Sequence, residues 1–372
     1  MEASGGSKYL GGLKVAAQVT GLSFQEDKKC VAVAVSRLDG DVWDGCVELW
    51  ALEALDQEGA VAARGDGPTK GCVGRLPTPC GIGPLCWVAG SASKAKPLLA
   101  YGRDDGNVEL VVWESKKAGV AHTLSMTEHD GLVTCLLAGD EGLLASGAAD
   151  GSVRVWETAA TIPQASAATL PCPFGGANVS CMAAAPWANA SLSVLLVCYG
   201  GAAGACAPCL CLWDRSKGKL EPPTITMYPT ALPPSEGAPA AAVSPRASPL
   251  CCAYSSASPH AVWVGFDDGS LAKYDDAKLG DGPLLVTAPH GTAAVRALVS
   301  VSAGGVVSCG EDGRAVLVGE DGACGACAVD GRDDFILSAA SVRVGGAQVA
   351  VLTGGMDGQV RLTSIEGNAA TA

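Results

Sequence analysis

The chain has 372 residues, of which 48% are hydrophobic and 17% charged, and its formal net charge is −13. The hydrophobic fraction is large enough for a folded core and excludes global disorder. The negative charge disfavours direct binding of nucleic acid, whose phosphates would be repelled, and favours basic protein partners.

The first twelve residues, MEASGGSKYLGG, lack the apolar core of a secretory signal, and we expect residues 1–12 to be disordered. An apolar segment, residues 13–19, follows. Further along, LDGDVWDGCVELW contains two Asp-Gly dipeptides, Asp39-Gly40 and Asp44-Gly45, on either side of Trp43. Asp-Gly next to an alternating apolar run predicts a tight turn, since glycine accepts the positive φ that such turns require.

A repeat governs the chain and is clearest in residues 129–157, HDGLVTCLLAGDEGLLASGAADGSVRVWE. It predicts three short strands, because apolar and polar positions alternate and turn signals separate them. The last part of the unit, Asp-Gly followed by a strand, recurs five more times, and a sixth copy has GGAAGACAPC in place of the Asp-Gly turn. The units are spaced 43 to 63 residues apart. The seven units end at Trp50, Trp113, Trp156, Trp213, Tyr274, Val318 and Thr363. Seven such units predict an all-β fold, a seven-bladed WD-repeat β-propeller.

We expect residues 1–372 to form this single domain. Too few residues follow Thr363 for a fourth strand in the last blade, so residues 13–19 are predicted to supply it and to close the ring. Residues 221–249 contain eight prolines and are predicted to form an extended Pro-rich loop, in which TITMY serves as an outer strand of blade four.

The stretch of residues 173–213 has no charged side chain and is long enough to cross a bilayer. Its glycines and prolines favour two strands joined by a Gly-rich loop, so we expect no membrane span. The chain also has seventeen cysteines, which we interpret as reduced and buried, with no metal site and no cofactor. The pairs Cys206/Cys209 and Cys324/Cys327 leave a four-cysteine zinc site as the alternative.

Two sets of residues resemble a catalytic triad. His129, Ser146 and Asp150 recur as His290, Ser308 and Asp312 at nearly the same spacing. A nucleophilic site repeated in equivalent units would be unusual, whereas WD repeats commonly carry this set, completed by a tryptophan such as Trp156, as a hydrogen-bonded structural tetrad. We therefore expect no enzyme; the alternative is a hydrolase that uses His129 or His290.

Three stretches resemble one family of propellers. They are AVSRLDGDVWDGCVELWAL (residues 34–52), TEHDGLVTCLL (127–137) and GRDDFILSAASV (331–342). The chain resembles the methylosome protein 50 family, the WD-repeat partner of the type II protein arginine methyltransferase, which dimethylates arginine symmetrically. The resemblance follows the chain order through all seven blades.

The resemblance implies a non-catalytic adaptor, present in cytoplasm and nucleus, that presents arginine-rich histones and Sm proteins to the methyltransferase. It implies that Trp43 is exposed and inserts into the methyltransferase, with Asp41 and Asp44 beside it at the partner-binding site. The alternative is that Trp43 packs on its own propeller beside Trp50. A propeller adaptor of another complex, a ubiquitin-ligase substrate receptor or a nucleoporin-like scaffold, would not need Trp43. The acidic turns that are candidates for attracting basic substrates are Asp104/Asp105, Glu128/Asp130 and Glu311/Asp312.

Overall fold

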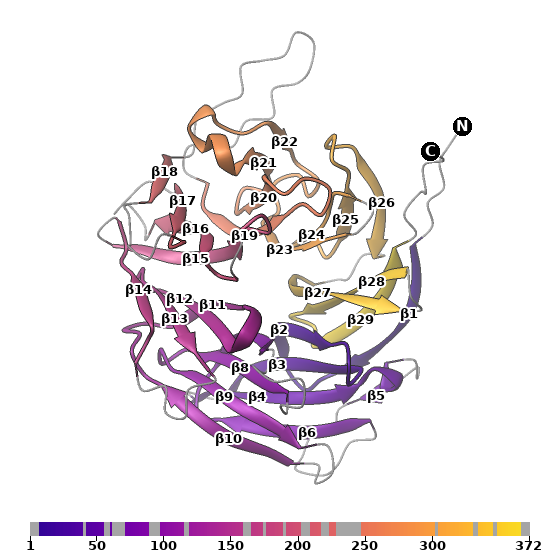
Figure 1. The fold of residues 1–372 in the computed structure, drawn as a ribbon. Helices are drawn as coiled ribbons and strands as arrows, with labels where there is room; N and C mark the ends of the chain where they lie inside the picture. Colours follow the sequence, from indigo (N-terminus) through magenta and orange to yellow (C-terminus); the bar gives the residue numbers. More distant parts are fainter. Residues whose placement is uncertain are drawn as a thin grey trace.

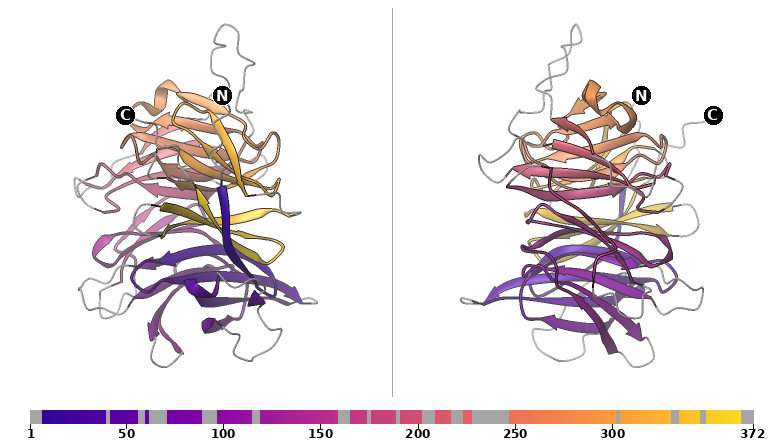
Figure 2. Two further views of the ribbon diagram at one scale, coloured as in Figure 1. Left: turned by 90° about the vertical axis from the view of Figure 1, so that its right-hand side faces the viewer. Right: turned by 60° about the vertical axis from the view of Figure 1, so that its left-hand side comes forward.

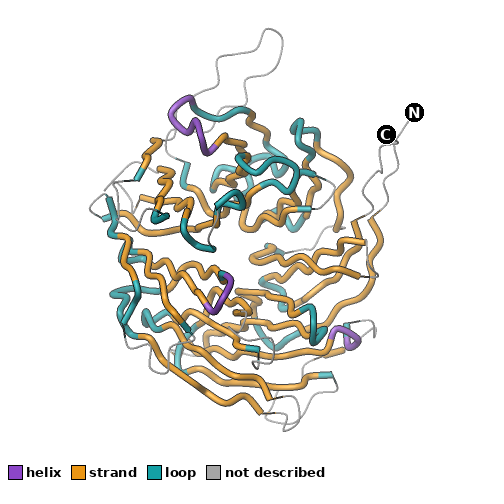
Figure 3. Tube along the Cα trace, viewed as in Figure 1, coloured by secondary structure: helices purple, strands orange, loops and turns teal. Residues whose placement is uncertain are grey.

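The protein is a ring of seven antiparallel sheets in the computed structural model, and strands dominate its trace (Figures 1 and 3). This confirms the predicted seven-bladed β-propeller. The structure describes residues 7–39, 42–55, 60–61, 71–88, 97–114, 119–158, 165–173, 176–188, 191–201, 209–216, 223–227, 247–301, 304–329, 334–344 and 348–365.

The first four blades each use strands in chain order, and among the described strands only in blade one does a strand of another sheet, β5 (Ala60–Val61), intervene between the third strand and the fourth. Their strands are β2 (Gln18–Gln25), β3 (Cys30–Asp39), β4 (Val42–Ala51) and β6 (Cys72–Thr78); β7 (Ile82–Val88), β8 (Leu98–Arg103), β9 (Val108–Glu114) and β10 (Gly119–Met126); β11 (Val133–Ala138), β12 (Leu143–Ala148), β13 (Val153–Glu157) and β14 (Ala168–Leu170); and β15 (Ala177–Ala184), β16 (Val194–Gly201), β17 (Cys209–Asp214) and β18 (Thr224–Met227).

Blades five and six follow the same rule, and blade seven joins the two ends of the chain. Their strands are β19 (Pro249–Tyr254), β20 (Ala261–Phe266), β21 (Leu271–Asp275) and β22 (Leu285–Thr287); β23 (Val295–Ser300), β24 (Val306–Gly310), β25 (Ala315–Val318) and β26 (Cys324–Val329); and β27 (Ile336–Val344), β28 (Gln348–Gly355), β29 (Gln359–Ile365) and β1 (Ser7–Lys14). The described helices are short 3₁₀ segments, η1 (Leu52–Ala54), η2 (Asp140–Gly142) and η3 (Asp276–Asp281).

The ring is closed by β1, which pairs antiparallel with β29 as the outer strand of blade seven (Figure 1). An N-terminal strand was predicted here, but its position was wrong: of the predicted residues 13–19 only Leu13 and Lys14 lie in β1, and Gln18 already opens blade one. Disorder over residues 1–12 is likewise corrected: residues 7–12 lie in β1, and residues 1–6 lie outside the described part. A short fifth strand, β5 (Ala60–Val61), runs parallel to β1 on its other edge.

The hydrophobic core lies between neighbouring blades. Trp156 of blade three, for example, is fully buried and packs in one cluster with Val108 and Leu110 of blade two. Burial on both faces explains why the blade strands are rich in valine, leucine and alanine. It also explains the apolar stretch of residues 173–213, which forms three strands, β15, β16 and β17, where two were predicted. Among the described residues, no helix has the length and apolar character to cross a bilayer.

Blade one carries a longer hairpin than the other blades. Its strands β3 and β4 have ten residues each, whereas β12 and β13 of blade three have six and five. The hairpin projects beyond the neighbouring blades (Figure 2). The predicted turn at Asp44-Gly45 is wrong: Asp44 pairs with Arg37 across the hairpin, so the strands continue through both residues and reverse between Asp39 and Val42.

The Pro-rich loop contains the expected outer strand, since Thr224–Met227 form β18 of blade four. Pro249, the last residue of the predicted loop, opens β19 instead. Residues 221–222 and 228–246 of that loop lie outside the described part of the chain.

Candidate functional site

The first candidate set lies inside blade three and forms a continuous hydrogen-bonded chain. His129 Nδ1 is 3.1 Å from Asp150 Oδ2, and His129 Nε2 is 2.7 Å from Ser146 Oγ. Trp156 Nε1 donates to the same Ser146 oxygen at 2.9 Å. The turn Asp150-Gly151 places the carboxylate above the histidine, and Gly151 adopts the left-handed φ of 79° that the turn requires. The structure thus brings all four predicted residues together.

The second set repeats this geometry in blade six without the tryptophan. His290 Nδ1 is 2.8 Å from Asp312 Oδ1, and His290 Nε2 is 2.9 Å from Ser308 Oγ. Val318 stands where blade three has Trp156, and the Ser308 hydroxyl turns instead toward the Val316 carbonyl at 3.4 Å. Ser146 and Ser308 have no exposed surface. Neither hydroxyl can meet a substrate in this conformation, so the geometry favours a structural role over nucleophilic chemistry.

The electrostatics of both sets follow from burial. Burial lowers the pKa of His129 and of His290, although the neighbouring Asp150 and Asp312 oppose the shift. Backbone and side-chain hydrogen bonds hold the pKa of both aspartates below its usual value, despite partial burial. Each set therefore pairs a neutral imidazole with an ionised carboxylate near neutral pH.

These shifts predict an acid-sensitive fold. An unfolded histidine takes up a proton near pH 6.5, whereas a folded histidine with a lowered pKa does so only in more acidic solution. The stabilisation from His129 and His290 is therefore complete above about pH 6.5 and is lost as the pH falls through their folded pKa values. Urea unfolding at pH 7.5 and 5.5 should show the wild type losing more stability than a His129→Gln/His290→Gln variant. Equal losses in the two proteins would contradict this assignment.

The projecting hairpin of blade one carries the candidate partner-binding residues. Leu38 and Trp43 face each other across it and are 62% and 39% exposed. Below them, Arg37 makes two hydrogen bonds to the Asp44 carboxylate, at 2.7 and 2.9 Å. The hydrogen bond from Arg37 is the main cause of the lowered pKa of Asp44. Asp41, the third predicted residue, lies outside the described residues.

Trp43 contacts blade two. Its Nε1 donates to Asp104 Oδ2 at 2.7 Å, and a Cβ atom added at Gly81 would lie 1.8 Å from that nitrogen. Alternation along β4 places Trp43 on the face of Val47 and Leu49, whereas Trp50 lies on the opposite face. The alternative of a Trp43 beside Trp50 is therefore wrong in its position, although Trp43 does pack on its own propeller, against blade two. The indole stays partly exposed while its polar edge is held by Asp104.

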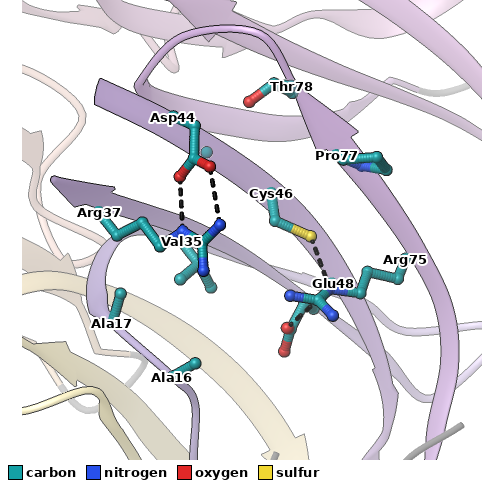
Figure 4. A pocket seen from close by; sticks show the side chains of 11 residues that line it. Ala16, Ala17, Val35, Arg37, Asp44, Cys46, Glu48, Arg75, Pro77 and Thr78 are labelled. Atoms are coloured by element: carbon teal, nitrogen blue, oxygen red, sulfur yellow. Dashed lines mark hydrogen bonds and ion pairs between the residues drawn. The ribbon is translucent and has the colours of Figure 1, made fainter. Parts of the chain in front are cut away.

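A cavity of about 320 Å³ lies on the other face of the hairpin, against the segment that links blade seven to blade one (Figure 4). Glu48 is almost fully buried there, 3.5 Å from Arg75, and accepts a hydrogen bond from Trp50 Nε1 at 3.0 Å. Arg75 also donates to Cys46 Sγ at 3.2 Å. Burial raises the pKa of Glu48 despite these partners. Cys46, Glu48 and Trp50 share one face of β4, as the alternation predicts.

Most of the acidic turns proposed to attract substrates are bound to arginines of this chain. Glu128 pairs with Arg154, Asp105 with Arg103 and Glu311 with Arg296. Asp312 pairs with Arg314 and His290. Asp104 receives the indole of Trp43, and Asp130 is exposed. The individual turns are thus weaker candidates than the net charge of the whole protein.

Sequence reasoning missed two clusters of metal-ligating groups. His260, Asp275 and Asp276 form one, but the Asp276 carboxylate is already met by Trp187 Nε1, Tyr254 Oη and His260 Nδ1 at 2.7 to 2.8 Å. Cys181, Cys198 and Cys252 form the other. Of the predicted CxxC pairs, Cys209 is buried in blade four and Cys324 is exposed in blade six, while Cys206 and the side chain of Cys327 lie outside the described part.

The comparison with family models agrees with this architecture. The model of the WD domain, G-beta repeat, matches residues 121–157, from within β10 to the end of β13. This range contains the complete tetrad of blade three. A WD40 repeat within a seven-bladed propeller fits a WD-repeat protein, a class whose members typically act as non-catalytic scaffolds or adaptors that bind other proteins. No curated protein matches the chain significantly.

Proposed function

We propose that this propeller is a non-catalytic adaptor that docks a symmetric-dimethylating protein arginine methyltransferase on the blade-one hairpin and helps to present arginine-rich substrates such as histones and Sm proteins. The observation that carries the proposal is the exposed pair Leu38 and Trp43 at the end of a hairpin longer than that of the other blades. The sequence resemblance to the methylosome protein 50 family in residues 34–52 supports the choice of partner. Such an adaptor would work in cytoplasm and nucleus.

The hairpin has the physical character of an interface anchor. A tryptophan buries about 150–250 Å² on docking, and aromatic residues dominate the hot spots of protein interfaces. The Arg37–Asp44 pair and the Trp43–Asp104 hydrogen bond hold Asp44 and Trp43 in place before a partner arrives. Ordering in advance lowers the entropic cost of binding, so this arrangement favours docking without rearrangement.

The charge of −13 suits the substrates. Long-range attraction depends on the summed field of the protein more than on any one carboxylate, so it survives the pairing of individual acidic turns with arginines. We expect substrate capture to weaken steeply with salt, whereas docking of the methyltransferase through an apolar anchor should be less sensitive.

The test is co-purification of the wild type and Trp43→Ala with the symmetric arginine methyltransferase of the same organism. Trp187→Ala is the matched control, because Trp187 is 37% exposed but lies at blades four and five. We expect Trp43→Ala to weaken binding by about 2 kcal/mol or more, roughly thirtyfold, and Trp187→Ala to leave it unchanged. Circular dichroism and thermal unfolding confirm that both variants are folded.

A third variant, Asp104→Ala, reports on the bound orientation of Trp43. If the indole docks as the structure holds it, loss of the Asp104 hydrogen bond weakens binding. If the indole must swing out, the same change strengthens binding. If the wild type binds and Trp43→Ala binds equally well, the role of Trp43 as anchor is refuted, but the methyltransferase remains the partner. A wild type that does not bind would refute the partner and leave a WD-repeat scaffold of another complex.

A further inference from the structure

Three thiols meet in the interior of the propeller, between blades four and five. Cys181 of β15 and Cys198 of β16 are directly paired across blade four, and Cys252 of β19 reaches them from blade five. The three Sγ atoms all lie within 4.8 Å of one another. All three are free cysteines, with Cys181 and Cys198 buried and Cys252 half-buried.

The surroundings of the three thiols are apolar. The cluster that contains them includes Ala183, Leu196 and Val264, and no aspartate, glutamate or histidine belongs to the metal-ligating group among the described residues. The donors are therefore sulfur alone. Soft thiolate ligands select soft metal ions and discriminate against magnesium and calcium, which require oxygen.

The number of sulfur donors further restricts which metal ion can bind. Structural zinc almost always takes four protein ligands in a tetrahedron. Here three sulfurs stand close together, and the adjacent Cys251 is engaged elsewhere, since its Sγ lies 3.4 Å from the Val295 carbonyl oxygen. We propose that Cys181, Cys198 and Cys252 form a binding site for one soft, thiophilic cation held by three sulfur ligands, with Cu(I) as the ion that fits it best.

Binding of copper at this site requires no redox step. Copper enters and stays as Cu(I), each thiol that becomes a thiolate ligand releases one proton, and three Cu–S bonds replace at most three S–H bonds. Hydrogen bonds from Cys181 and Cys198 lower the pKa of Cys252, whereas burial raises the pKa of the other two thiols. Cys252 is also the most accessible of the three, so it is the natural first ligand. Affinity should rise with pH, because each ligand must lose a proton.

The test is an anaerobic titration of the reduced full chain with Cu(I), supplied as its complex with a chromophoric chelator that competes for the metal. Bound copper is counted per chain in the wild type, in Cys252→Ser and, as a control, in Cys324→Ser, whose cysteine is exposed and outside the trio. We expect Cys252→Ser to bind one copper fewer than the wild type and Cys324→Ser to retain the tight copper. Cu(I) should also raise the melting temperature of the wild type by joining blades four and five, and this rise should disappear in Cys252→Ser.

Equal copper content in the wild type and Cys252→Ser would overturn the proposal, as would a wild type that fails to take Cu(I) from the chelator. A second variant, Cys252→Ala, distinguishes a lost ligand from a folding defect in Cys252→Ser. If Cys252→Ala is folded, it must show the same loss of one copper. Zinc supplied in the same titration should not displace Cu(I) from the trio. Displacement by zinc would show that the site recruits a fourth ligand and would refute the three-sulfur assignment.

Discussion

Removal of residues 1–14 should cost this propeller a large part of its stability and cause it to aggregate. The deletion removes β1, and with it Leu13, which is buried in one cluster with Val360 and Leu362. Val15, next to the cut, loses its place in the same cluster. Burial of a leucine and a valine contributes about 3–6 kcal/mol together, against a typical total of about 5–15 kcal/mol. The deletion also exposes the edge of β29 as an unpaired strand, which promotes association between molecules.

Thermal unfolding and light scattering measure both effects. Deletion of residues 1–6, which precede β1, is the matched control and should leave the melting temperature unchanged. A circular permutant offers a rescue, because Ser7 pairs with Ile365. This permutant starts at Val15 and carries residues 7–14 after a short loop that follows Ile365. We expect it to regain the stability lost in the 1–14 deletion. A 1–14 deletion as stable as the wild type would refute the role of β1 in closing the ring.

Replacement of Trp156 by alanine should be the most damaging single change in the tetrad. The side chain is fully buried, and loss of a buried tryptophan typically costs about 3–5 kcal/mol. It also donates to Ser146 Oγ, so the serine and His129 lose part of their network. Urea unfolding at pH 7.5 measures the change.

Two further variants distinguish the cost of the cavity left by the tryptophan from the cost of the lost hydrogen bond. Trp156→Phe keeps most of the ring but removes the N–H donor, and we expect a loss of about 1–2 kcal/mol. Val318→Ala is the counterpart in blade six, where no tryptophan joins the network, and should cost less than Trp156→Ala. If Trp156→Ala loses less stability than Val318→Ala, the tryptophan does not make the dominant contribution to the stability of its blade.

The fold was readable from the sequence because one unit recurs. Each Asp-Gly turn with its following strand marks the third strand of a blade, and blades two, three, five, six and seven carry this signal in place. Blade four has no Asp-Gly dipeptide before its third strand. Blade one misled the prediction, because it contains two Asp-Gly dipeptides and only the first reverses the chain. Counting outward from a turn at Gly40 and Asp41 would have paired Leu38 with Trp43 and Arg37 with Asp44 in advance.

The site was readable only where its partners are neighbours in the repeat. His129, Ser146, Asp150 and Trp156 lie within one unit, so their spacing sufficed to group them. Trp43 meets Asp104 across a blade boundary, and Cys181, Cys198 and Cys252 meet across another. Spacing along the chain carries no signal for such contacts, because side-chain direction in two different sheets decides them. The turn predicted at Asp44-Gly45 also placed Trp43 outside the strand that carries Trp50, so the face of Trp43 on that strand could not be assigned.

The pairing of β1 with β29 also imposes an order of events on biosynthesis. The two strands are separated by roughly 350 residues, so β1 leaves the ribosome roughly 20–70 s before its partner at ordinary rates of translation. During that interval its apolar side chains have no final place, although β5, much nearer in the chain, can cover one edge of β1. A nascent chain of this kind is a natural client of chaperones until the ring shuts.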